Sequence, residues 1–476
     1  MIAARPEFSR ARPGQPGRVY AVCRRRKELF AALHNQITEG AILKPLLSFF
    51  FPILLGTFFQ QLYNTVDAII VGNFVGTAAL GAVGGPTAVL INFLVNLFVG
   101  LSSGATVVIA QYYGARQGED LREAVHTGIA LSLAAGVVIT GVGIALSGPV
   151  LRMMGTPEDV MGYALTYLRV YFCGTMASFI YNMGSSILRA IGDTKRPLYF
   201  LIAACLTNIV LDALFVAVLQ WGAEGAALAT ILSQFVGGAI PLVYFLRPNS
   251  SKLRLGRTAF HGRALLKACA NGSSEFMTNI SMSVVNMLYN WQLMRLMGSG
   301  GVAVYGVIMY VNFIFIAIFL GYSMGSAPIV GYHYGAGNRT ELRGLLRKSL
   351  CIITVMSVVL TAAALLLARP LSMIFMSKEA TLLPVTIRAF SIYSLSFLMA
   401  GYNIYASSFF TALNDGFISA LISFARTLVF QVAAVTVLPV LWDIDGVWAA
   451  VVAAETLALL LSAACLVGKR KKYGYA

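Results

Sequence analysis

The sequence predicts an all-α membrane protein with about 12 transmembrane helices in two six-helix bundles related by pseudo-two-fold symmetry. Composition, the spacing of apolar stretches and an internal repeat lead to this class. Of the 476 residues, 58% are hydrophobic and only 11% are charged, whereas soluble domains carry about 25% charged residues. A soluble protein cannot bury that much apolar surface, so the cytosolic, secreted, fibrous and disordered classes are excluded.

The individual helices follow from the length rule for membrane spans, which requires about 20 mostly apolar residues for each. Applied to the whole sequence, this rule predicts spans at 46–71, 80–111, 124–147, 163–187, 198–219, 226–246, 268–295, 302–332, 349–368, 386–411, 417–440 and 446–467.

The basic residues lie mainly on one side of these spans. The chain has 35 Lys and Arg against 19 Asp and Glu, a net charge of +16. When successive connections are assigned to alternate sides, 29 of the 35 basic residues fall on the same side. Cytoplasmic connections carry such an excess, so both termini are expected in the cytoplasm. The charge therefore orients the chain, and no nucleic-acid partner is predicted.

Two stretches of the chain repeat at an offset of 221 residues. Residues 100–122 read GLSSGATVVIAQYYGARQGEDLR, and residues 321–343 read GYSMGSAPIVGYHYGAGNRTELR. Trp221 and Trp442 match at the same offset. Such a repeat indicates a duplication. Two halves of six spans each have the same orientation, which is typical of transporters with a substrate cavity between the halves.

The resulting organisation is a basic arm, two bundles joined by a linker, and a basic tail. We expect a disordered cytoplasmic arm at 1–44, bundles at 45–246 and 268–467, a cytoplasmic linker at 247–267 and a cytoplasmic tail at 468–476. The arm has no apolar segment typical of a cleavable signal peptide. Adhesion of the arm to anionic lipid is the alternative to a free tail.

Only four acidic residues fall inside the predicted spans: Asp67, Asp212, Glu275 and Glu455. A charge at the bilayer centre costs about 2.5–3.5 kcal/mol on insertion scales, so each needs a partner, water or a proton. Interhelical hydrogen bonding without any transport chemistry is the alternative, and the sequence leaves the role of Glu455 open.

The first span carries a polar stripe that ends at one of these acids. Gln60, Asn64 and Asp67 are three or four residues apart, so they share one helical face. Because such a face is costly against lipid, it should face protein or water. Pro52 lies in the same span and should kink it, acting as a hinge.

The fifth span places a second acid in the same half of the chain. Asn208 and Asp212 are four residues apart, and the rise of about 1.5 Å per residue puts Asp212 and Asp67 in the same leaflet. Thr230 of the sixth span is a third contributor. Two nearby carboxylates in a low dielectric favour a shared proton. With amide and hydroxyl oxygens around them, Asp67, Asn208 and Asp212 suit Na⁺ equally well.

The seventh span carries its own stripe, Glu275, Asn279, Asn286 and Asn290. Together with the stripe of the first span, it is expected to line the substrate cavity. For Glu275, which lies near the cytoplasmic end, a role at the start of its helix is the alternative.

Other chemistry is not indicated. The chain lacks GxxxxGK[ST] and any close Cys or His cluster, so no cofactor, no metal enzyme and no nucleotide-driven pump is predicted. Energy for uphill transport must then come from an ion gradient.

The chain resembles the multidrug and toxic compound extrusion (MATE) transporters over about residues 40–467. The resemblance rests on PILLGTFFQQLYNTVDAIIVGNFVG (52–76), IAQYYGARQGEDLREA (109–124), ILRAIGDTKRPL (187–198) and TNIVLDALFVAVLQWGAEGAALAT (207–230). It implies two six-helix bundles and antiport of drugs, often amphipathic organic cations, against H⁺ or Na⁺.

The resemblance also extends to single residues. Asp67 and Pro52 match the acid and the proline of the family's first helix, and Asn208, Asp212 and Thr230 match the polar cluster of its N-terminal cation site. Glu275 resembles the seventh-helix acid of another branch. That branch also has an acid on helix ten, which this chain lacks, so we expect the ion site in the N-terminal bundle.

We therefore expect a monomeric antiporter in a bacterial plasma membrane that acts on small organic substrates and contacts lipid. A lipid or lipid-linked oligosaccharide flippase of the same superfamily is the alternative, although it should have a more cationic cavity. Only Arg169, Arg295 and Arg426 lie within or near spans. A membrane-embedded enzyme would need clustered His or Ser/Asp pairs, which do not stand out.

Overall fold

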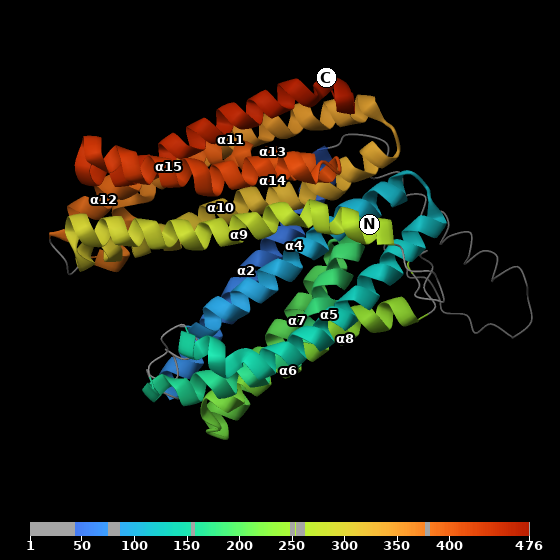
Figure 1. The fold of residues 1–476 in the computed structure, drawn as a ribbon, viewed down its shortest axis with the longest axis horizontal. Coiled ribbons are helices and arrows are strands. Elements are labelled where there is room, and N and C mark those ends of the chain that lie inside the picture. The colour runs from blue at the N-terminus through green and yellow to red at the C-terminus, as the bar shows by residue number, and fades with distance from the viewer. Residues whose placement is uncertain are drawn as a thin grey trace, which may run out of the picture. The chain divides into compact units, whose positions relative to one another are not determined.

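A computed structural model describes residues 43–74, 86–153, 158–247, 253, 262–376 and 381–475. The expected N-terminal arm and most of the expected linker lie outside these residues. Leu46–Ala476 form one compact unit. Every regular element in the described part of the chain is helical, so the predicted all-α class is confirmed (Figure 1).

The N-terminal bundle contains the first half of the elements. These are α2 (Leu43–Phe74), α4 (Pro86–Gly114), α5 (Gly118–Met153), α6 (Glu158–Ala190), α7 (Lys195–Asp212), its π-helical continuation η1 (Ala213–Val218), and α8 (Gly222–Leu246). Helix α6 packs against α4, α5 and α8, and α7 packs against α8.

The C-terminal bundle follows the same plan. Its elements are α9 (Gly262–Met297), α10 (Ser299–Gly335), α11 (Arg339–Met376), α12 (Leu382–Ser394), α13 (Phe397–Ala412), α14 (Gly416–Phe424), the π-helical segment η2 (Ala425–Val429) and α15 (Phe430–Tyr473). Trp442 and Asp443 have non-helical backbone angles, so α15 is two helices joined at a kink. The described helices thus overlap each of the predicted spans, and residues 80–85 of the second span lie outside the described part of the chain.

Six helices of the described residues are long and apolar enough to cross a membrane, and the bent pair of α12 and α13 makes a seventh. Helices α6 and α9 are long enough but more polar. These lengths and apolar compositions agree with a multi-pass membrane protein.

Helix boundaries coincide with residues that suit turns. Asp415 accepts a hydrogen bond from the backbone N–H of Ile418 and so caps the start of α14. Helix α4 ends at Gly114, and Arg116 in the following turn has a positive φ of 58°. Some spans continue beyond the predicted limits, and α15 extends into the expected tail as far as Tyr473.

The two bundles meet through glycines of α4, α9 and α10. A Cβ on Gly114 would lie 2.1 Å from the carbonyl oxygen of Tyr332, and a Cβ on Gly335 would lie 2.2 Å from that of Gln111. Both pairs are related by the offset of 221. Each half therefore presents the same patch to the other, as expected for two-fold related halves.

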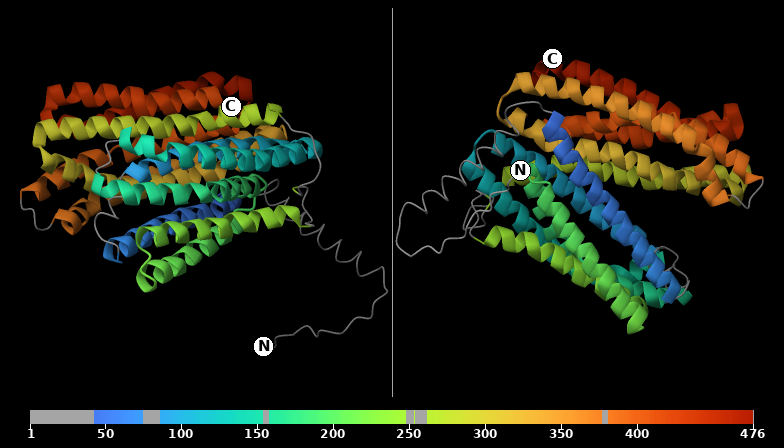
Figure 2. Two further views of the ribbon diagram at one scale, coloured as in Figure 1. Left: turned by 60° about the horizontal axis from the view of Figure 1, so that its bottom comes forward. Right: turned by 180° about the vertical axis from the view of Figure 1, so that it is seen from behind.

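Helix α2 contacts both bundles. Near its start, Phe50 packs against Gly321, Gly325 and Tyr322 of α10. Further along, Gly56 packs against Leu201 of α7. In the rear view of Figure 2, α2 (blue) accordingly begins beside the C-terminal bundle and continues along the N-terminal one.

Candidate functional site

Buried polar side chains gather on α2 and α7 of the N-terminal bundle. Asn208 and Asp212 occupy one face of α7 and are 0% exposed, and Asp67 of α2 is 9% exposed. Asp67 and Asp212 lie near enough for their charges to interact. The structure therefore brings together the two acids that the helical spacing singled out.

Most polar atoms of these side chains make no regular hydrogen bond among the described residues, although Asn208 lies close enough to Asp212 to interact with its carboxylate. Both carboxylate oxygens of Asp212, Oδ1 of Asp67, and both side-chain polar atoms of Asn208 are buried without a partner among the described residues. A buried, unpaired carboxylate is costly unless it is protonated or binds a cation. Carboxylate and amide oxygens are also the ligands that hard cations prefer. The cluster therefore suits a proton or Na⁺.

Thr230, a predicted contributor to this cluster, is buried on α8, a helix that packs against α7. Its hydroxyl donates to the carbonyl of Ala226 at 3.0 Å, which leaves the lone pairs of the oxygen available. The π-helical segment η1 begins directly after Asp212. Such segments frequently occur at functional sites.

The residues expected to line the substrate cavity are less enclosed. Gln60 is exposed, and the side chain of Asn64 lies outside the described residues. On α9, Asn286 and Asn290 are exposed, whereas Glu275 and Asn279 are half-buried. The side chain of Asn286 accepts a hydrogen bond from the Tyr305 hydroxyl at 2.7 Å. No contact joins the α2 and α9 stripes among the described residues, so their shared role stays a prediction.

The sequence analysis missed a buried ion pair in the C-terminal bundle. Nε of Arg426 donates to both carboxylate oxygens of Glu455, at 2.8 and 2.9 Å, and Nη2 lies 2.8 Å from Oε1. Asn403 donates to Oε2 of Glu455 at 2.7 Å, and Ser462 donates to Oδ1 of Asn403 at 3.0 Å. The sequence did contain a signal for this pair, because Arg426 and Glu455 have opposite charges and lie in consecutive predicted spans of the C-terminal half.

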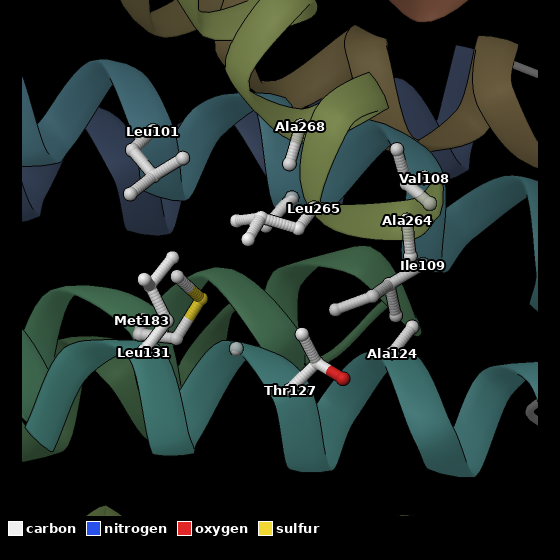
Figure 3. Close-up of a pocket in the computed structure, with 12 residues that line it drawn as sticks. Leu101, Val108, Ile109, Ala124, Thr127, Leu131, Met183, Ala264, Leu265 and Ala268 are labelled. Carbon is white, nitrogen blue, oxygen red and sulfur yellow. The ribbon is translucent and has the colours of Figure 1, made fainter. Parts of the chain in front are cut away.

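A small pocket in the described part of the chain lies away from both clusters (Figure 3). Its lining comes from α4, α5, Met183 of α6 and the first turns of α9, and Thr127 is its one polar side chain. None of the predicted site residues lines it. We therefore assign the candidate site to the polar cluster on α2, α7 and α8.

Two helical bundles with buried, unpaired acids define a polytopic transporter. The sequence model of the MatE family matches residues 52–214 and 276–436, one segment in each bundle. Because these segments cover more than half of the chain, the protein belongs to the MatE family. It is accordingly a transporter and not an enzyme.

Individual relatives agree with this assignment. The chain is 33% identical over 210 residues to the probable multidrug resistance protein YpnP of Bacillus subtilis, an alignment that covers 44% of this chain and 47% of YpnP. It is 21% identical to the multidrug export protein MepA of Staphylococcus haemolyticus, over 89% of this chain and 93% of MepA.

A solved structure shares the fold. A multidrug resistance MATE family transporter of the MOP superfamily, in an outward-facing conformation, superposes with a TM-score of 0.84. The two chains are 26% identical, and the superposition covers 92% of this chain and 97% of the other. The prediction of two helical bundles in a membrane protein is thereby confirmed.

Proposed function

We propose that the protein is a cation-coupled antiporter that exports drugs or other amphipathic, often cationic organic compounds. The observation that carries the coupling part is the burial of Asp67, Asn208 and Asp212 close together, with several polar atoms that make no regular hydrogen bond among the described residues. Named multidrug transporters among the relatives support the class of substrate. We further propose a bacterial plasma membrane location with both termini in the cytoplasm, in line with the sorting of basic residues.

The coupling ion, H⁺ or Na⁺, would bind from outside to the cluster of Asp67, Asn208, Asp212 and Thr230. Neutralisation of the two acids removes their mutual repulsion and their desolvation penalty. The ion thus favours an arrangement in which α2 packs more tightly against α7. It shifts the equilibrium between the loose and the tight arrangement because it binds the tight one with higher affinity.

Helix α2 transmits this change because it touches both bundles close to Pro52. Phe50 contacts α10, and Gly56 contacts α7. Proline removes one backbone hydrogen bond from the helix and so makes bending at this point less costly. Bending α2 would move the bundles relative to each other and release the substrate outward from a cavity lined by Gln60, Asn64, Glu275, Asn279, Asn286 and Asn290.

Drug efflux from a susceptible bacterial host tests this function. Cells expressing the wild type should survive concentrations of cationic dyes or antibiotics that kill the control host. Asp67→Asn and Asp212→Asn keep the side-chain shape but cannot release a proton or offer a second carboxylate oxygen. Both variants should lose resistance at unchanged expression, and full resistance in both would contradict the proposal.

A further inference from the structure

Among the described residues of the C-terminal bundle, Glu455 is the most deeply buried acid, and its surroundings are opposite to those of Asp212. The side chains of Arg426 and Glu455 are 15% and 6% exposed. Two nitrogens of the guanidinium contact the carboxylate at 2.8–2.9 Å. Pairing of this kind is geometrically specific and charge-assisted. Glu455 is therefore already neutralised, whereas Asp212 is not.

Hydrogen bonds fix the carboxylate from other sides as well. Asn403 of α13 donates to Oε2 of Glu455 at 2.7 Å and also to its backbone carbonyl at 2.9 Å. Ser462 holds Asn403 in turn at 3.0 Å. Tyr289 of α9 and Tyr393 of α12 lie within electrostatic range of Glu455. The single cation that faces Glu455 among these groups is Arg426.

The internal repeat shows that this arrangement belongs to one half only. At the offset of 221, Glu455 corresponds to Gln234 and Arg426 to Cys205, which are both uncharged. Conversely, Asp212 corresponds to an alanine, at position 433. Asp212 and Glu455 thus each occupy a position that is neutral in the other bundle, and a cationic side chain accompanies only Glu455.

We propose that Arg426 acts as a built-in cation that neutralises Glu455 and thereby keeps the coupling ion from binding at this acid. This inference rests on the proposed cation coupling at Asp212. The guanidinium occupies the ligands that a free cation or a proton would otherwise use. Because it is tethered to η2, it neutralises the acid in every state of the transport cycle and responds to no ion gradient.

Removing the tethered cation should expose a second ion site. Arg426→Met keeps the length of the side chain and frees Glu455, and the double variant Arg426→Met/Glu455→Gln removes both charges. We would measure binding of radioactive Na⁺ and proton uptake by the purified full-length protein. Arg426→Met should gain about one bound Na⁺ or one titrating proton per chain over the double variant. Equal values for both variants in both measurements would overturn the proposal.

A second variant keeps the test decisive even when Arg426→Met does not fold. Glu455→Gln retains an oxygen that accepts from Arg426, so it should keep the local geometry, although the unpaired guanidinium should lower the stability of the protein. It should bind as many coupling ions as the wild type, because Glu455 is not an ion ligand there. A loss of bound Na⁺ or protons in Glu455→Gln would overturn the proposal.

The same assays separate this inference from the proposed function. Asp212→Asn should abolish the ion binding of the wild type. If the wild type binds no ion, the N-terminal site is refuted. The comparison of Arg426→Met with the double variant tests only whether Arg426 neutralises Glu455.

Discussion

At the residue scale, three buried acids illustrate different solutions to the cost of a charge away from water. Asp67 and Asp212 have no cationic partner among the described residues, and Glu455 makes three contacts with one guanidinium and one with an amide. An unpaired group favours the neutral or cation-bound form, while a paired one stays charged. Substitution of Asp212 should therefore affect transport more than stability, and substitution of Arg426 or Glu455 should affect stability more than transport.

For Asp212→Asn, we predict lost transport without lost stability. The amide removes a buried, unpaired charge, so the midpoint of thermal unfolding in detergent should stay the same or rise. Drug efflux should fall at least about fivefold, since coupling free energies are about 1–3 kcal/mol. Unfolding midpoints of purified protein and dye efflux from cells measure the two effects. A lower midpoint combined with normal efflux would refute this assignment.

For the ion pair, we predict strong thermodynamic coupling. Arg426→Met alone leaves a buried carboxylate unpaired and should destabilise the protein by about 3–5 kcal/mol, whereas the double variant Arg426→Met/Glu455→Leu should recover most of that loss. Unfolding midpoints of the wild type, both single variants and the double variant give the coupling energy. Additive single effects would show that the pair contributes nothing to stability.

At the scale of elements, the bundles approach each other where glycine leaves room for a backbone. Gly114 of α4 and Gly335 of α10 contact carbonyls of the opposite helix, and Gly104 of α4 contacts Ala268 and Gly272 of α9. These contacts lie at the helix ends that the basic residues assign to the cytoplasm. We infer that the structure is closed on the cytoplasmic side.

Gly114→Ala should therefore open this contact. Its Cβ would overlap the Tyr332 carbonyl, and the separation of α4 from α10 should cost about 1–3 kcal/mol. Gly306→Ala in α10 is the matched control because nothing lies within 4 Å of its Cβ. Labelling of a cysteine introduced at position 111 by a cytoplasmic thiol reagent measures the opening. Equal labelling in Gly114→Ala and Gly306→Ala would contradict the prediction.

The sequence was sufficient to predict the helices but not how they contact one another. Apolar length predicted where the described helices lie, and helical spacing selected Asn208 and Asp212, because both properties are local. The π-helical segments and the 44° bend between α12 and α13 carry no such local signal, whereas the kink at Trp442 falls in the predicted gap between spans 417–440 and 446–467. Arg426 and Glu455 are 29 residues apart in the sequence. Their pairing depends on how their two helical segments are aligned in space, which periodicity alone does not determine.

At the scale of the whole molecule, transport requires the two bundles to move relative to each other. The side chain of Gln111 in α4 donates to the carbonyl of Ala412 in α13 at 2.9 Å, a direct bond between the bundles. A covalent link at this point should hold the cytoplasmic side closed.

In a background without native cysteines, Gln111→Cys/Ala412→Cys treated with a short, reducible thiol crosslinker should lose drug efflux and regain it after reduction. Thr354→Cys/Tyr402→Cys is the matched control, because those side chains contact each other at 2.7 Å within one bundle. Its efflux should survive the same treatment. Undiminished efflux in the linked 111/412 variant would mean that the bundles need not separate there.

Ion coupling through the N-terminal bundle is the central claim, and drug uptake by proteoliposomes with separately imposed Na⁺ and pH gradients tests it most directly. The account predicts that at least one gradient drives uptake by the wild type, and that Asp212→Asn abolishes it while Glu455→Gln retains it. Gradient-driven uptake that persists in Asp212→Asn and disappears in Glu455→Gln would contradict the account.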